Sequence, residues 1–259
     1  MTALPFPIEL DLIGIGSGNP DHVTRQAVAA INAADLILLP RKGAAKDDLA
    51  ELRRVILGAC LTNPATRVVE FDLPARATGH ADYAGGVGLW HDQIAEAWAG
   101  ALRGAGPAPR VPVRVALLVW GDPSLFDSSL RVARRLTPAP RIRALPGISA
   151  LHALTAAHAI PLNTTGQPVV ITTGRRLRER GWPGEADSVA VFVDADGAFR
   201  HLPPEGIRIW WGAYVGMAQE LLDHGPLAEA GPRILSARAA ARARHGWIMD
   251  LYLLRRTGD

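Results

Sequence analysis

Three glycine-bearing loops carry most of the residues that could do chemistry in this chain. They lie at residues 14–20 (GIGSGNP), 120–129 (WGDPSLFDSS) and 146–150 (PGISA). Each loop follows an apolar stretch typical of a buried strand and precedes a stretch with helical spacing. Open α/β sheets bind their ligands at the carboxyl ends of strands, so this repeated setting favours ligand binding over three unrelated turns.

The middle loop has the richest set of polar groups. Gly121 allows a ligand to approach the backbone closely, and Asp122 offers an acceptor to a hydroxyl or an ammonium group. The alternative is an ordinary strand-to-helix turn, in which the Asp122 carboxylate accepts backbone N–H groups. Ser124 is the expected N-cap of the helix that follows.

The first loop argues against a dinucleotide-binding protein. An NAD fingerprint needs its third glycine one place later than Gly18 and an acidic residue after the next strand. Asp35 instead precedes the strand expected at residues 36–39. A nicotinamide-dependent oxidoreductase is therefore disfavoured, although close approach of this backbone to some other group is still expected. A tight strand-to-helix turn stays open as the structural alternative.

Alternating strands and helices must position these loops, and their order predicts an α/β fold. Strands are expected at residues 8–15, 36–39, 68–71, 113–120, 141–145, 169–173, 188–193, 207–211 and 247–254. Helices are expected at residues 23–34, 46–57, 87–101, 125–133 and 151–158. The last strand should be antiparallel at a sheet edge, and the basic, alanine-rich segment 233–244 should be solvated. A boundary near residue 144 divides the chain into expected domains of residues 1–143 and 144–259.

Composition limits the class of protein. The 259 residues are 48% hydrophobic, which suffices for a core in each of two domains. Cys60 is the one cysteine, which excludes an internal disulfide and a cysteine-based zinc site, and no other metal-ligand cluster is evident. We expect a cytoplasmic protein without a signal peptide or membrane span. A net charge of +3 is too small to predict nucleic-acid binding.

The order and spacing of the three loops resemble the tetrapyrrole methylases that use S-adenosylmethionine, and the resemblance covers essentially the whole chain. It implies two α/β domains with mixed sheets, a homodimer, and a cofactor in the cleft between the domains. Stretches at residues 83–91, 209–214 and 245–256 resemble the member of cobalamin biosynthesis that methylates C-1 of precorrin-5. That member also releases the extruded acetyl group as acetate.

The resemblance further implies which residues bind S-adenosylmethionine. They are Pro20, Trp120, Gly121, Asp122, Leu125, Ser149, Ala150, Val193, Gly212 and Ala213. Trp120 to Leu125 would hold the methionine part and the ribose, and the backbone of Gly212 and Ala213 would meet the adenine. The uroporphyrinogen methylases place an aspartate just after the second strand. This chain has Pro40 there, so the role of that aspartate does not transfer.

The two steps of such a reaction need different groups. Methyl transfer from a sulfonium mainly needs alignment, whereas removal of an acetyl group needs a base for water and a donor for the oxyanion. The candidate catalytic residues are His91, Tyr83 and Asp127. Trp90 is expected to anchor its helix in the core, which would turn His91 toward the cleft. Cationic side chains suit the acidic arms of a tetrapyrrole, and the candidates are Arg41, Lys42, Arg131 and Arg175.

Two other functions stay open at this point. Another corrin-ring C-methyltransferase would add the methyl group without losing acetate, so the mass of the product distinguishes it. A nucleotide-binding sensor would bind the cofactor and turn nothing over.

Overall fold

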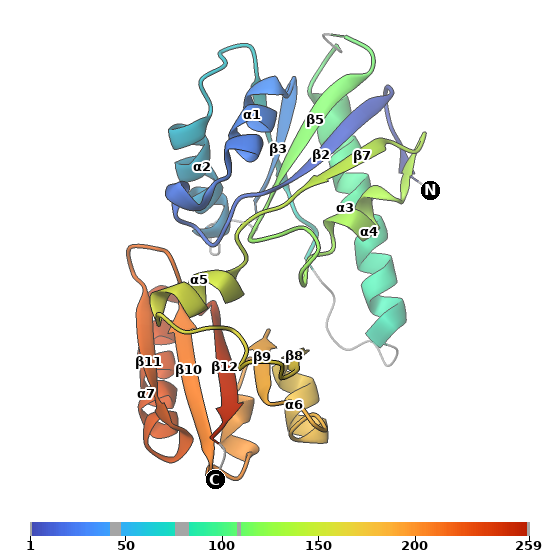
Figure 1. Cartoon of the computed structure of the whole chain (residues 1–259). Coiled ribbons are helices and arrows are strands. Elements are labelled where there is room, and N and C mark those ends of the chain that lie inside the picture. The colour runs from blue at the N-terminus through green and yellow to red at the C-terminus, as the bar shows by residue number, and fades with distance from the viewer. Residues whose placement is uncertain (1, 42–47, 76–82, 108–109, 258–259) are drawn as a thin grey trace. The chain divides into compact units, whose positions relative to one another are not determined.

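The chain forms two compact units, Met1–Ile148 and Ser149–Asp259, and each has its own sheet and core (Figure 1). The computed structural model describes residues 2–41, 48–75, 83–107 and 110–257, without the side chains at 48–49 and 83–84. The division follows Ile148 and not residue 143, because strand β7 (Arg141–Leu145) pairs with β2 (Ile8–Gly14) in the first unit.

The first unit is built on a parallel sheet with the strand order β4-β3-β5-β2-β7. The remaining strands are β4 (Arg67–Asp72), β3 (Leu36–Arg41) and β5 (Val113–Val119). Five of the seven residues of β5 are apolar and consecutive, and the strand lies between β3 and β2. A strand in that position is covered on both faces, which explains its continuous hydrophobic run.

Helices cover both faces of this sheet, and the side chains of β5 alternate between them (Figure 1). Helices α1 (Arg25–Ala33) and α2 (Asp48–Cys60) pack against one face, which receives Ala116 and Leu118. Helices α3 (Tyr83–Gly104) and α4 (Ser129–Ala133) pack against the other, which receives Val115 and Leu117. Short elements complete the unit: β1 (Thr2–Ala3), paired with β6 (Leu136–Thr137), and the 3-10 turn η1 (Pro20–His22).

The second unit has a mixed sheet with the strand order β11-β10-β12-β9-β8. Its strands are β8 (Val169–Thr173), β9 (Ser188–Phe192), β10 (Ile207–Ala213), β11 (Leu221–Pro226) and β12 (Asp250–Arg256). Only the pair β8–β9 is parallel among these strands. Helix α5 (Ala150–Ala157) packs on one face, and α6 (Gly174–Arg180), η2 (Ala198–His201) and α7 (Leu227–His245) pack on the other. The predicted α/β class is confirmed, and a mixed sheet is found in the second unit, whereas the five-stranded sheet of the first unit is parallel.

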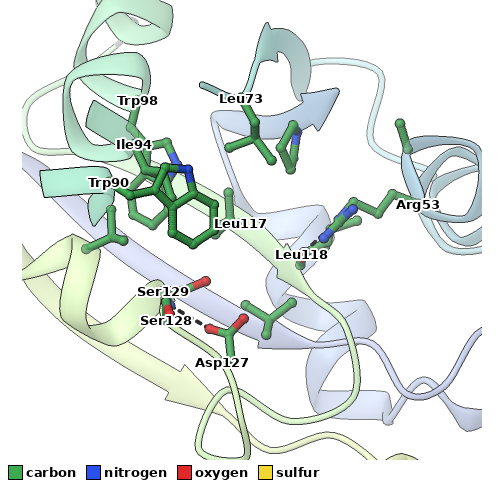
Figure 2. A pocket seen from close by; sticks show the side chains of 14 residues that line it. Arg53, Leu73, Trp90, Ile94, Trp98, Leu117, Leu118, Asp127, Ser128 and Ser129 are labelled. Carbon is green, nitrogen blue, oxygen red and sulfur yellow. Dashed lines mark hydrogen bonds between the residues drawn. The ribbon is translucent and has the colours of Figure 1, made fainter. Parts of the chain in front are cut away.

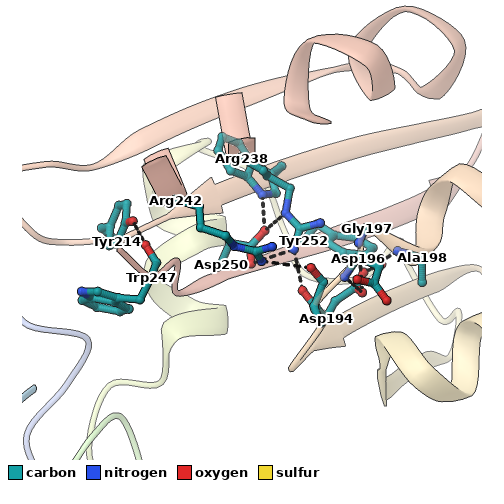
Figure 3. Close-up of polar contacts among 12 residues, drawn as sticks. Asp194, Asp196, Gly197, Ala198, Tyr214, Arg238, Arg242, Trp247, Asp250 and Tyr252 are labelled. Carbon is teal, nitrogen blue, oxygen red and sulfur yellow. Dashed lines mark hydrogen bonds and ion pairs between the residues drawn. The ribbon is translucent and has the colours of Figure 1, made fainter. Parts of the chain in front are cut away.

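A buried polar network joins α7 to the sheet of the second unit (Figure 3). Arg238 of α7 approaches Asp250 of β12 to 2.7 Å, and these side chains are 6% and 4% exposed. Asp250 also accepts a hydrogen bond from the indole of Trp211 at 2.7 Å. Asp194, just after β9, accepts from the Tyr252 hydroxyl at 2.6 Å. Burial raises the pKa of Asp250, and Arg238 opposes that shift.

Three local predictions are wrong. The segment 233–244 is part of the 19-residue helix α7, and it carries the buried Arg238 where solvated residues were expected. Strand β12 is antiparallel as predicted but lies between β10 and β9, so it is central and not at an edge. The helix expected at 125–133 begins only at Ser129, with Ser128 as its N-cap, while Ser124 is hydrogen-bonded to Asp122.

Candidate functional site

The three glycine loops of the first unit lie together, because β2 is the middle strand between β5 and β7. Gly16 and Gly121 form an isolated antiparallel bridge between the first two loops. The Gly121 amide donates to the Gly16 carbonyl at 2.8 Å, and the Gly16 amide donates to Gly121 at 3.3 Å. The loops therefore form one surface of backbone at the carboxyl ends of parallel strands, which is where α/β sheets bind ligands.

Glycine is required here because the loops pack backbone against backbone. A Cβ atom on Gly14 would lie 2.6 Å from the Gly147 nitrogen and 2.8 Å from the Gly121 carbonyl oxygen. A Cβ atom on Gly147 would overlap that same carbonyl oxygen. Gly121 itself has a φ of 66°, which L side chains rarely adopt. The sequence predicted that another group would approach this backbone closely. In the structure that group is the backbone of the neighbouring loops.

Asp122 ties two of these loops together. Its Oδ2 atom accepts the Gly147 amide at 2.9 Å, and its Oδ1 atom accepts the Ser124 amide at 2.8 Å. These contacts are those of the alternative in which Asp122 accepts backbone N–H groups of its own turn, with one further hydrogen bond to a second loop. A direct contact of Asp122 with a ligand stays a prediction.

The other predicted cofactor residues of the first unit belong to the same loops. Pro20 is the first residue of η1, whose N-cap Asn19 accepts the Asp21 amide at 2.9 Å. Trp120 follows β5 directly and is half-buried, and the Leu125 amide closes the turn on the Asp122 carbonyl at 3.2 Å.

The remaining predicted cofactor residues belong to the second unit. Ser149 is the N-cap of α5, where its hydroxyl is 2.8 Å from Nδ1 of His152, and Ala150 begins that helix. Gly212 and Ala213 end β10, and a Cβ atom on Gly212 would lie 2.6 Å from the Val215 side chain. Val193 is 71% exposed and has a φ of 50°, a strained conformation for a β-branched residue.

A cavity of about 190 Å³ lies beside the carboxyl end of β5 in the first unit (Figure 2). Its walls come from β3, α2, β5, α3 and the start of α4. Most of the lining is apolar, and its polar side chains are Arg53, Asp127, Ser128, Ser129 and the indole groups of Trp90 and Trp98.

Two charged side chains of the cavity are held in place by the backbone. The Arg53 Nε donates to the Leu118 carbonyl at 2.9 Å, and the Asp127 Oδ1 accepts the Ser129 amide at 2.6 Å. Burial lowers the pKa of Arg53 to about 10, and the charge of Asp127 opposes that shift. Arg53 therefore remains protonated at neutral pH, in apolar surroundings.

The three candidate catalytic residues have different environments. Asp127 lines the cavity. His91 is 3% exposed and is not among the lining residues, while Trp90 lines the cavity and donates its indole N–H to Pro74 at 3.0 Å. Trp90 also packs against the core of the first unit, as expected, whereas His91 is buried and does not face this cavity. Tyr83 begins α3, but its side chain lies outside the described part of the structure.

The predicted substrate cations that the structure describes lie on three different elements. Arg41 ends β3 and pairs with Glu70 and Asp72 of β4, at 3.5 and 3.1 Å. Arg131 is exposed on α4, where it donates to the Asp127 carbonyl at 3.2 Å, and Arg175 is exposed on α6 of the second unit. Lys42 lies outside the described residues.

Arg53 was missed in the sequence, although a signal for it exists. It follows Leu49 by four residues and precedes Ile56 by three, which is the spacing of one helix face. A cation on the apolar face of an amphipathic helix is unusual and merits attention as a functional candidate.

Two other kinds of feature are absent from the described residues. They contain no group of three His, Cys, Asp or Glu side chains arranged to hold a metal ion. No described helix has both the length and the apolar character needed to cross a membrane.

Comparison with known proteins places the chain in a family. The model of the Tetrapyrrole (Corrin/Porphyrin) Methylases matches residues 9–231. A curated protein of Sinorhizobium sp., named precorrin-6A synthase (deacetylating), is 45% identical over 258 residues, covering 96% of this chain and 95% of the relative. The crystal structure of a cobalamin synthesis related protein, CobF, of Corynebacterium diphtheriae is 33% identical with a TM-score of 0.80, covering 97% of this chain and 100% of that one. Uroporphyrin-III C-methyltransferase of Thermus thermophilus, complexed with S-adenosylhomocysteine, shares the fold with 18% identity and a TM-score of 0.57, over 95% of this chain and 92% of that one. This chain therefore belongs to the tetrapyrrole (corrin/porphyrin) methylase family.

Proposed function

We propose that this protein is an S-adenosylmethionine-dependent C-methyltransferase that converts precorrin-5 to precorrin-6A and releases acetate, in cobalamin biosynthesis. The observation that carries the proposal is the 45% identity, over 96% of the chain, to a curated precorrin-6A synthase (deacetylating). The structural similarity to CobF along 97% of the chain supports the same assignment.

The backbone surface of the first unit suits a small polar cofactor. Its three loops meet at the carboxyl ends of β2, β5 and β7, where Gly14, Gly121 and Gly147 allow the backbones of the loops to pack closely together. S-Adenosylmethionine, when bound, supplies a methyl group activated on a sulfonium. The protein then contributes binding and alignment, since a methyl transfer to a nucleophilic carbon needs little acid–base help.

Each predicted cofactor residue has a role in this proposal. Backbone groups at Trp120 and Gly121 meet the methionine part and the ribose, with Pro20 and Leu125 beside them, and Asp122 keeps the loops in register. Residues of the second unit complete the set: Ser149, Ala150, Val193, Gly212 and Ala213. Arg131 and Arg175, both exposed, receive carboxylate arms of the substrate, since an arginine fork matches a carboxylate.

We also propose that the protein is a homodimer and acts in the cytoplasm, where S-adenosylmethionine is available. The dimer is supported by β11, an edge strand of its sheet on which Leu221 and Leu222 are 38% and 39% exposed. Apolar side chains on an unpaired edge favour strand pairing between copies. Sedimentation velocity tests the dimer, and cell fractionation tests the location.

Mass spectrometry of the reaction products tests the proposed function. Purified protein is incubated with precorrin-5 and S-adenosylmethionine, with a control that lacks the methyl donor. We expect a product that has gained one methyl group and lost its acetyl group, together with free acetate. Methylation with no acetate would instead identify another corrin-ring C-methyltransferase. Binding of S-adenosylhomocysteine with no turnover would identify a sensor.

A further inference from the structure

The cavity beside β5 combines an apolar wall with a charged end. In Figure 2 the indole rings of Trp90 and Trp98 lie on one side, Arg53 reaches in from α2 on the other, and Asp127 comes from the segment before α4. Methyl transfer needs neither an acidic nor a basic side chain. Methyl transfer therefore does not explain why Arg53 and Asp127 line this cavity.

The cavity has room for a small group. Its volume of about 190 Å³ holds several water molecules, so a two-carbon acyl group together with a water molecule fits in it. An acyl methyl group suits the wall of Trp90 and Ile94, and an acyl oxygen suits a guanidinium.

The charged pair is positioned by the main chain and is retained at a cost. Arg53 is oriented by the Leu118 carbonyl, and Asp127 is oriented by the Ser129 amide. Burying a guanidinium destabilises the folded state, because desolvation disfavours its charged form. Ionisable side chains whose pKa values are shifted by burial are frequent in the cavities where reactions occur.

We propose that this cavity is the deacetylation subsite: it receives the acetyl group of the substrate, Asp127 is the general base for the attacking water, and Arg53 stabilises the oxyanion and then the departing acetate. This inference rests on the proposed function and extends it, because it assigns the deacetylation step to named residues.

The step balances with water as the only co-reactant. Asp127 accepts a proton from water, and the water oxygen bonds to the acetyl carbonyl carbon, whose π electrons move onto the carbonyl oxygen beside Arg53. That oxygen then re-forms its double bond, and the carbon–carbon bond to the macrocycle breaks. Its electron pair enters the conjugated ring, and a ring carbon takes the proton held by Asp127. Acetic acid leaves and ionises.

Four variants test the proposal in the intact protein. Asp127→Asn and Arg53→Gln alter the cavity. Arg54→Gln is the matched control for arginine, since Arg54 pairs with Glu51 and Glu70 outside the cavity. Asp92→Asn is the control for aspartate, since Asp92 pairs with Arg135.

We expect both cavity variants to bind S-adenosylhomocysteine but to release acetate from precorrin-5 much more slowly than the wild type. Loss of a general base slows its step by about 10²–10⁴-fold, and loss of an oxyanion donor by about 10²–10³-fold. The two controls should release acetate at the wild-type rate.

The outcomes separate this inference from the proposed function. A wild-type protein that makes no methylated product refutes the proposed function itself. A wild-type protein that releases acetate, with Asp127→Asn and Arg53→Gln releasing it equally fast, refutes the subsite alone. Should either variant fail to fold, binding of ¹³C-labelled acetate to the wild type decides by NMR line broadening. Saturable broadening at millimolar acetate supports the subsite, and its absence overturns it.

Discussion

Asp122 connects residues far apart in the sequence through two backbone amides, those of Ser124 and Gly147. In Asp122→Asn one of the two carboxylate oxygens becomes an NH₂ group, which cannot accept a hydrogen bond. One of the two backbone N–H groups therefore loses its acceptor. We expect the free energy of unfolding to fall by about 1–3 kcal/mol, the cost of an unsatisfied donor. Binding of S-adenosylhomocysteine should weaken as well, because the loops lose their register. Urea unfolding and calorimetric titration measure the two effects.

The exposed Asp21 gives a matched control for that substitution. Asp21→Asn should leave both quantities near the wild-type values. If Asp122→Asn also left the free energy of unfolding unchanged, its two hydrogen bonds would contribute nothing to loop packing.

His158 makes the stability of the second unit depend on pH. Its Nε2 lies 3.0 Å from the Trp211 carbonyl oxygen, and burial lowers its pKa, a shift that the Trp211 carbonyl opposes. The unfolded chain therefore takes up a proton first as the pH falls below about 6.5. Stability is present above that pH and is lost as the pH falls toward the lowered folded pKa. We expect the Tm to decrease across this window.

Circular dichroism melts over the same pH range check this expectation. His158→Gln should reduce the decrease, because the amide can still donate to Trp211 and does not titrate. His201→Gln, at an exposed position, should not change it. An unchanged slope in His158→Gln would assign the pH dependence to other groups.

At the scale of elements, the ion pair of Arg238 and Asp250 fixes helix α7 on strand β12. Arg238→Met leaves a carboxylate buried without its cation, which typically costs about 3–5 kcal/mol. We expect that loss in the free energy of unfolding of the second unit, measured by urea denaturation. Adding Asp250→Asn removes the stranded charge and keeps an acceptor for Trp211, so the double variant should recover part of the loss. A double variant no more stable than Arg238→Met would contradict this account.

The sequence predicted the five strands of the larger sheet of the first unit to within a few residues, and its central strands are continuous apolar runs because they are buried on both faces. The short strands β1 and β6 were not predicted. It did not predict β11, whose LLDHGP sequence combines charge, glycine and proline. It also misjudged α7, since its alanine and arginine content resembles that of an exposed segment. The central position of β12 depends on pairings between distant strands, which local patterns do not encode.

Within the site, the sequence predicted the three loops because glycines that permit close backbone packing leave a visible pattern. The burial of His91 shows that the surroundings of a helical residue cannot be assigned from its neighbour in the sequence without the packing partners. Arg53 was missed because a cation in a helix is usually solvated, and only its spacing from Leu49 and Ile56 marks it as inward-facing.

At the scale of the whole molecule, S-adenosylhomocysteine should stabilise the protein. A ligand that binds only the folded state at about one hundred times its Kd adds about 2.7 kcal/mol to the free energy of unfolding. We expect a corresponding rise in Tm, measured by differential scanning calorimetry. NAD is the control and should have no effect, because the acidic residue of its fingerprint is missing. The opposite pattern would overturn the cofactor assignment.

The strand order of the second unit has a consequence for protein synthesis. Strand β12 follows every other strand in the sequence, yet it fills the place between β10 and β9. The sheet of the first unit is complete once β7 has left the ribosome, so that unit can fold while translation continues. The second sheet cannot be completed until β12 has been synthesised. Before that, the apolar side chains of Val191 and Trp211 lack their cross-strand partner Tyr252. Nascent chains paused before β12 are therefore the form of this protein most in need of a chaperone.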